Sequence, residues 1–108
     1  RILILGFTFK ENCPDTRNTK VVDIYHELRS FSNNIEIYDP WANPKEVYRE
    51  YMIHILESSQ TPDFYQYEAI ILAVAHTKFS EYNICKSDKT VVFDVKGILP
   101  KEHISARL

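Results

Sequence analysis

The sequence predicts an α/β domain in three layers, a mostly parallel sheet of about five strands with helices on both faces. Two apolar runs, residues 2–5 and 69–75, are rich in aliphatic side chains, which is typical of strands buried on both faces of a parallel sheet. Apolar residues recur at helical spacing within residues 21–31. Strands that alternate with helices in this way indicate a Rossmann-like architecture, although chain order alone leaves the strand order open.

The first strand, loop and helix form the corner around which the domain is organised. The strand covers residues 2–5 and ends at Gly6, and a polar loop covers residues 7–17. A helix is expected from Asn18 to Phe31, with Asn18 or Thr19 as its cap. In a parallel sheet this corner lies at the carboxyl end of the strands, where backbone N–H groups and the helix dipole favour anions. We therefore expect function there.

The later elements follow from apolar runs and from turn or capping residues. They are a strand at 35–38 ended by Asp39-Pro40, a helix from Pro44 to Tyr51 capped by Asn43, a short edge strand at 53–56, a short helix around Phe64, Tyr65 and Tyr67, a central strand at 69–75, a short helical segment at 78–82, a last strand at 90–94, and a tail at 100–108 that covers one edge.

Two cations stand in the loop that leads into the first helix. Lys10 and Arg17 lie near a helix N-terminus, where acids would be preferred, and Asp15 and Glu11 offset them only in part. An anionic ligand would explain these cations. The alternative is that both are solvated loop charges.

A further lysine follows the strand at 90–94. Gly97 permits a tight turn after this strand, and Lys96 can reach over the sheet edge toward Lys10. Two lysines that converge from distant segments are typical of a clamp for a diphosphate. Here too the alternative is a solvated turn lysine.

Two other polar residues stand at expected strand ends. His76 follows the central strand and could bind a ligand or transfer a proton, or it could be a structural polar group. Asp39 could hold a ribose, as acids after the second strand do in dinucleotide-binding folds. We favour a structural role for Asp39, because Gly6 and Gly97 are the only glycines and no G-x-G-x-x-G motif precedes it.

Composition limits the classes of function. The formal net charge of −2 argues against a nucleic-acid partner. Cys13 and Cys85 form no C-x-x-C pair, which is typical of a reducing, cytoplasmic setting, and the alternative is that the two cysteines form a disulfide. No run approaches the roughly 20 apolar residues that span a bilayer, and no secretory leader is expected, so we expect no membrane partner. At 108 residues the chain fits a single domain, 1–108.

Several segments together resemble one family. They are GFTFK at 6–10, CPDTRN at 13–18 with TKVVDI after it, YDPW at 38–41, AVAH at 73–76 and FDVKG at 93–97. The chain resembles, over nearly its whole length, the C-terminal UDP-binding domain of the UDP-glucose/GDP-mannose dehydrogenase family. Within the family it is most similar to the bacterial branch that oxidises UDP-N-acetylhexosamines for surface polysaccharides.

The resemblance implies a reaction and roles for residues. Members of the family use NAD in two oxidations that convert the primary alcohol of a UDP-sugar to a carboxylate, through an enzyme-bound thiohemiacetal and thioester. Phe9 and Lys10 match a pair that contacts substrate, and Lys10 would neutralise phosphate charge. Arg17 matches an arginine that reaches the dinucleotide across an interdomain cleft. Lys96 stands where UDP-glucose enzymes carry an arginine, which favours the N-acetylhexosamine branch. Asp15, His76 and Gly97 are secondary site candidates.

The family's G-x-G-x-x-G site, nucleophilic cysteine and dimerising helix would lie N-terminal to this domain. Cys13 would therefore be a loop residue, and this fragment alone should be inactive. The resemblance also implies a homodimer or higher oligomer for the full-length protein. Two alternatives remain, a receiver-like module that holds Mg²⁺ on strand-end acids, and an interaction domain that binds no nucleotide.

Overall fold

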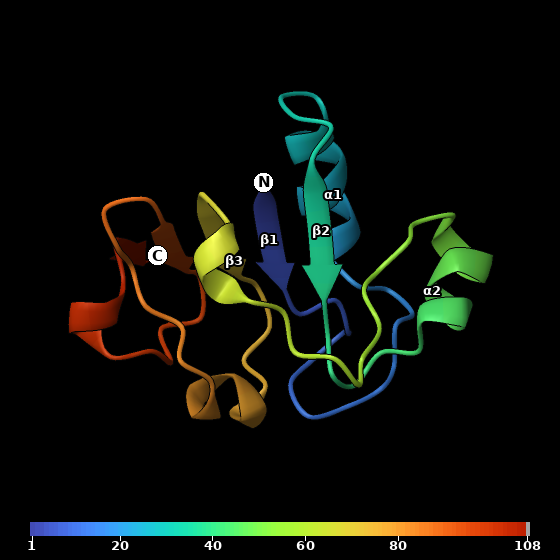
Figure 1. Cartoon of the computed structure of the whole chain (residues 1–108). Helices are drawn as coiled ribbons and strands as arrows, with labels where there is room; N and C mark the ends of the chain where they lie inside the picture. Colours follow the sequence, from blue (N-terminus) through green and yellow to red (C-terminus); the bar gives the residue numbers. More distant parts are fainter. Residues whose placement is uncertain (108) are drawn as a thin grey trace.

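The computed structural model describes residues 1–107, which form a five-stranded, all-parallel sheet with the strand order β2-β1-β3-β4-β5 (Figure 1). The strands are β1 (Ile2–Leu5), β2 (Ile35–Tyr38), β3 (Ala69–Leu72), β4 (Val91–Asp94) and β5 (Ala106–Arg107). The chain moves outward from β1 to β2, then returns to the other side of β1 and continues from β3 to β5. The order therefore reverses between β1 and β3, and open α/β sheets form ligand crevices at the carboxyl ends of such a strand pair.

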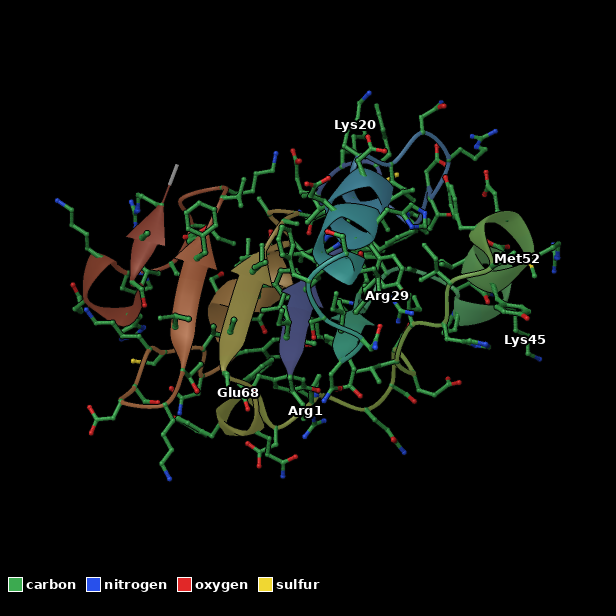
Figure 2. The ribbon with its side chains drawn as sticks, turned by 90° about the horizontal axis from the view of Figure 1, so that it is seen from above. Arg1, Lys20, Arg29, Lys45, Met52 and Glu68 are labelled. Carbon is green, nitrogen blue, oxygen red and sulfur yellow. The ribbon has the colours of Figure 1, made fainter. Side chains whose placement is uncertain are left out.

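Different kinds of helix cover the two faces of the sheet. Alternate residues of β1 face opposite ways, so Ile4 packs in the layer with α1 (Val21–Arg29) and α2 (Pro44–Tyr51), while Leu3 and Leu5 pack in the other layer. Figure 2 shows α1 over its face of the sheet and α2 beyond the β2 edge. On the other face, the short 3₁₀ helices η1 (Phe64–Gln66) and η2 (Thr77–Glu81) place Phe64 and Phe79 in the hydrophobic cluster. A third 3₁₀ helix, η3 (Lys101–His103), has no buried residue. The predicted α/β fold with helices on both faces is confirmed.

The second α-helix begins and ends where the sequence predicts. The Asn43 side-chain oxygen accepts hydrogen bonds from the backbone N–H groups of Lys45 (2.9 Å) and Glu46 (3.4 Å), as a capping residue does. Pro44 takes the first helical position, where its missing N–H costs nothing. Met52 ends the helix in the left-handed conformation, with φ of 60°.

The first α-helix begins at Val21, later than the sequence predicts, and neither Asn18 nor Thr19 is its cap. Asn18 has φ of +59°, a left-handed conformation that cannot continue into a helix, and Lys20 is the capping position. The hydroxyl of Thr19 still accepts a hydrogen bond from the N–H of Val21, at 3.2 Å. The polar loop is thus three residues longer than the prediction, which had ended it at Arg17.

The prediction of an edge strand at 53–56 is wrong. Only one backbone bond links this segment to the sheet, from the N–H of Leu56 to the carbonyl of Ile37 (2.9 Å). The fifth strand is instead β5, within the tail, where Ala106 pairs with Phe93 and Arg107 with Asp94. The central strand ends at Leu72, because the N–H groups of Ala73 and Val74 both turn to the carbonyl of Leu5.

Within residues 1–107, no helix has the length and apolar character needed to cross a membrane.

Candidate functional site: a lysine-lined cavity at the strand reversal

A cavity of about 210 Å³ opens at the point where the strand order reverses. We call it the lysine cavity. Its walls are residues 8–11 after β1, residues 20–21 at the start of α1, residues 73–75 after β3, and Lys96 after β4. Lys10, Lys20 and Lys96 therefore line one cavity, although they lie far apart in the sequence. Glu11 is the only acid in the wall. Within the described residues, none of the three ammonium groups has a carboxylate oxygen within 4.0 Å.

Val74 in the cavity wall packs closely against Gly6, at the end of β1. Gly6 has φ of +101°, and a β-carbon on it would lie 2.5 Å from Cβ of Val74 and 2.9 Å from the backbone nitrogen of Val74. Only glycine fits both this conformation and this contact. Glycine at this position therefore lets the loop after β1 lie against the segment after β3.

The carboxylate of Asp39, at the end of β2, fixes the start of the loop after β1. Its Oδ2 accepts hydrogen bonds from the backbone N–H groups of Phe7 (2.6 Å) and Thr8 (3.0 Å), and its Oδ1 accepts one from Trp41 (2.7 Å). Burial by itself raises the pKa of Asp39, but the hydrogen bond from His76 and these N–H groups outweigh burial and lower the pKa below 3.8. The structural role that we favoured for Asp39 accounts for all of these contacts.

His76 is completely buried, and the structure uses both of its ring nitrogens. Nδ1 accepts a hydrogen bond from the backbone N–H of Asn12 at 2.8 Å. Because Nδ1 accepts, the ring is neutral and carries its proton on Nε2, which lies 3.0 Å from Oδ2 of Asp39 and 3.1 Å from Oγ1 of Thr8. In this arrangement neither nitrogen of His76 is available to a ligand, because both contact the loop after β1.

A second buried carboxylate, Asp94 at the end of β4, forms the turn that carries Lys96. Its Oδ1 accepts hydrogen bonds from the N–H groups of Lys96 (3.1 Å) and Gly97 (2.7 Å), and its Oδ2 accepts one from Leu99 (2.8 Å). Gly97 has φ of +71°, as the predicted tight turn requires. The segments that carry Lys10 and Lys96 are therefore held by two different buried carboxylates, Asp39 and Asp94.

Phe9 lies next to Lys10 in the cavity wall and is 54% exposed. Its backbone N–H donates to the carbonyl of Asp15 at 2.7 Å, which closes the polar loop on itself. An exposed aromatic ring beside a cationic cavity is free to contact a ligand, but its predicted contact with substrate stays a prediction.

Arg17 lies apart from the lysine cavity. Its Nε and Nη2 donate to the two carboxylate oxygens of Asp15 at 3.0 and 3.2 Å. The hydrogen bonds and charge of this pair raise the pKa of Arg17 and lower the pKa of Asp15. Both residues line a separate surface groove, which also includes Glu46, Arg49 and Glu50 of α2.

Lys20 is the cavity residue that the sequence analysis missed. It occupies the capping position of α1 and lines the lysine cavity, and Figure 2 shows it at the N-terminal end of that helix. Like Lys10, Lys20 is a cation near a helix N-terminus, and this feature of the sequence is the signal that identifies it.

Residues 3–101 match the model of the UDP-glucose/GDP-mannose dehydrogenase family, UDP binding domain. The chain belongs to this family. It is 44% identical to the UDP-N-acetyl-D-glucosamine 6-dehydrogenase of Salmonella typhi, over 99% of the chain and 26% of that protein. It is 42% identical to the enzyme of the same name from Pseudomonas aeruginosa, over 100% of the chain and 26% of that protein. The resemblance noted in the sequence is confirmed.

A solved structure of a UDP-glucose dehydrogenase from the archaeon Pyrobaculum islandicum superposes with a TM-score of 0.74 at 21% identity, over 98% of this chain and 24% of that chain. This similarity supports the fold. The chain spans only 26% of the length of each of the two 6-dehydrogenases that it matches.

Proposed function

We propose that this chain is the UDP-binding domain of an NAD-dependent UDP-sugar 6-dehydrogenase, and that the lysine cavity holds the diphosphate of the UDP-sugar. One observation carries the proposal. Lys10, Lys20 and Lys96 come from three segments and meet in one cavity at the strand reversal, with no carboxylate within 4.0 Å of their ammonium groups among residues 1–107. Glu11 in the wall can offset only one of these three positive charges, and a diphosphate is an anion that would neutralise the remainder.

The first helix adds to this attraction. The cavity wall includes Val21, the first residue of α1, so the positive end of the helix dipole lies at the same region. Lysine ammonium groups act as compact point charges, which suit a diphosphate that presents oxygens in several directions. Phe9 would pack against the nucleotide or sugar.

Arg17 would contact NAD rather than UDP. It lies outside the lysine cavity, in the groove with residues of α2, and its pairing with Asp15 holds the guanidinium at the surface. The chain contains no G-x-G-x-x-G motif to bind the dinucleotide, so NAD would be held mainly by a domain outside these residues. In this chain Arg17 would contribute one contact to NAD, and the other domain would supply the rest of the binding site.

For the substrate we propose a UDP-N-acetylhexosamine, with a UDP-hexose as the alternative. Two relatives above 40% identity are named UDP-N-acetyl-D-glucosamine 6-dehydrogenases, and Lys96 departs from the arginine expected in UDP-glucose enzymes. We further propose that the full-length protein is bacterial and cytoplasmic, and that it has an N-terminal dinucleotide-binding domain and a central dimerising helix. It would form a homodimer or a higher oligomer. Residues 1–108 alone would have no dehydrogenase activity.

Calorimetric titration of the chain with UDP tests the proposed site. Lys10→Ala and Lys96→Ala should each weaken UDP binding by about tenfold to a hundredfold, because each removes a charge-assisted contact worth about 1.5–3 kcal/mol. Lys45→Ala is the control, since it removes the same charge from α2, away from Lys20 (Figure 2). Equal effects of all three substitutions would mean that UDP responds only to net charge, and would overturn the assignment of the cavity.

A further inference from the structure

We propose that His76 is a positioning residue for Lys10, and that its neutral, Nε2-protonated ring holds the loop 7–12 so that Lys10 faces the lysine cavity. This inference rests on the proposed function, in which Lys10 contacts the diphosphate. Nothing in the sequence pattern separates this role from that of an ordinary buried histidine. The hydrogen bonds of His76 to residues before and after Lys10 distinguish a positioning histidine from one that only fills the core.

The contacts of His76 flank Lys10 in the sequence. On one side Nε2 lies 3.1 Å from Oγ1 of Thr8, and that hydroxyl donates to the carbonyl of Lys10 itself at 2.9 Å. On the other side, the N–H of Asn12 donates to Nδ1 at 2.8 Å. A single imidazole thus contacts the side chain two residues before Lys10 and the backbone two residues after it.

Asn12 ties the same loop to the segment that carries His76. Its Nδ2 donates to Oγ1 of Thr77 at 2.9 Å, and its Oδ1 accepts from the N–H of Thr77 at 3.0 Å. Asn12 also adopts a left-handed conformation, with φ of +55°. Non-glycine residues adopt that conformation at a cost, so the surrounding bonds must maintain it.

The orientation of the ring is set from beneath by Asp39. Its Oδ2 lies 3.0 Å from Nε2, so the carboxylate selects the tautomer with the proton on that nitrogen. The other nitrogen must then present a lone pair, and the N–H of Asn12 is the donor that uses it. The rings of Phe79 and Trp41, at 5.3 and 6.3 Å between ring centres, pack against the imidazole.

Lys96 provides an internal comparison, because its turn makes no bond to His76. In that turn the carboxylate of Asp94 accepts the N–H groups of Lys96, Gly97 and Leu99. Loss of the imidazole should therefore displace Lys10 and leave Lys96 in place. A residue that merely stabilised the whole domain would affect both lysines alike.

A double-mutant cycle on UDP affinity separates these roles. The variants are His76→Phe, which keeps a ring without nitrogens, Lys10→Ala, Lys96→Ala and the two double mutants, all titrated with UDP where circular dichroism shows them folded. His76→Phe should weaken UDP binding about three- to tenfold, with no further loss in the Lys10→Ala background and a fully additive loss in the Lys96→Ala background. Equal additivity in both backgrounds would overturn the positioning role.

A conservative variant adds a second readout. His76→Asn keeps an acceptor close to the position of Nδ1, so it should restore part of the UDP affinity and the slow hydrogen exchange of the Asn12 amide, both of which His76→Phe loses. If His76→Phe does not fold, the cycle is run with His76→Asn and His76→Gln. No rescue by either amide would count against the proposal. If Lys10→Ala leaves UDP affinity unchanged, the diphosphate assignment fails first and this inference falls with it.

Discussion

Two groups of cations lie beside the loop after β1, and their charges are balanced in different ways. In the lysine cavity, Lys10, Lys20 and Lys96 face a common space without a paired carboxylate among residues 1–107. In a separate surface groove, Arg17 is bound by both carboxylate oxygens of Asp15. The first arrangement leaves positive charge for a ligand, whereas the second holds one guanidinium in a fixed orientation at the surface.

The two regions also differ in how they are supported from within. Buried carboxylates, Asp39 and Asp94, hold the loops that carry Lys10 and Lys96. Asp15 is instead a loop residue near the surface, only two positions from its partner. Substitutions that disturb the packing and hydrogen bonds behind the lysine cavity should therefore lower the stability of the whole domain. Substitutions of Arg17 or Asp15 should have only local effects.

The largest effect is expected from Gly6→Ala. A methyl group there meets Val74 at 2.5 Å and must adopt φ of +101°, so we expect a loss of about 3 kcal/mol or more in the free energy of unfolding. Urea denaturation measures it. Gly97→Ala is the matched control, because its nearest neighbour would be Nη1 of Arg107 at 3.9 Å, and strain alone should cost about 1 kcal/mol. Equal losses would show that the close packing beneath the cavity is unimportant.

A smaller, pH-dependent effect is expected from Asp39→Asn. Near neutral pH it should cost about 2–4 kcal/mol, because the amide cannot accept every hydrogen bond that the carboxylate accepts. The pKa of Asp39 is lower in the folded protein than its ordinary value of 3.8, so its charge stabilises the fold above about pH 4. That stabilisation is lost as the pH falls through the folded-state pKa.

Urea denaturation of the wild type and of Asp39→Asn between pH 3 and pH 7 measures how the stabilisation by the Asp39 charge depends on pH. The difference in stability should be constant from about pH 5 upward and shrink below about pH 4. A difference that grows on acidification would contradict the lowered pKa of Asp39. Asp15→Asn, which changes the exposed carboxylate, is the control and should show a much weaker pH dependence.

The smallest effect on this chain is expected from Arg17→Ala. The guanidinium lies outside the lysine cavity and its charge is already paired, so UDP affinity should change by less than about twofold. In the full-length protein the same substitution should lower the apparent affinity for NAD more than that for the UDP-sugar. Initial-rate kinetics with each substrate varied would show the order, and the reverse order would remove Arg17 from the dinucleotide side.

The sequence predicts those parts of the fold that depend on local pattern. β1, β2 and α2 have the expected bounds, because branched apolar runs and the Asn43-Pro44 start are strong local signals. Residues 53–56 resemble a strand in composition but join the sheet through one backbone bond, while β5 has only two exposed residues and no strand pattern. Which segment pairs with a sheet edge depends on tertiary packing, which local pattern does not contain.

The site was predictable to a similar extent. Lys10 and Lys96 follow β1 and β4, which are separated by β3, and they line one cavity because the carboxyl ends of parallel strands lie at the same edge of the sheet. That rule needs no coordinates. Their roles in binding stay a prediction. The contacts of His76 with Thr8 and Asn12 were not foreseeable, since they require a left-handed residue at position 12 and a particular ring tautomer. Hydrogen bonds between loops follow from the fold and not from residue spacing.

The position of β1 between β2 and β3 has a consequence for how the chain folds. Ile2 to Leu5 pair on one side with residues 35–38 and on the other with residues 69–72. Both partners come later in the chain, so β1 has no backbone partner until some thirty, and then nearly seventy, residues beyond it have been made. Such long-range pairing slows folding. During synthesis on the ribosome, the most apolar segment of the domain therefore stays unpaired until both partner strands have been made. Premature contacts of this segment are the expected start of misfolding.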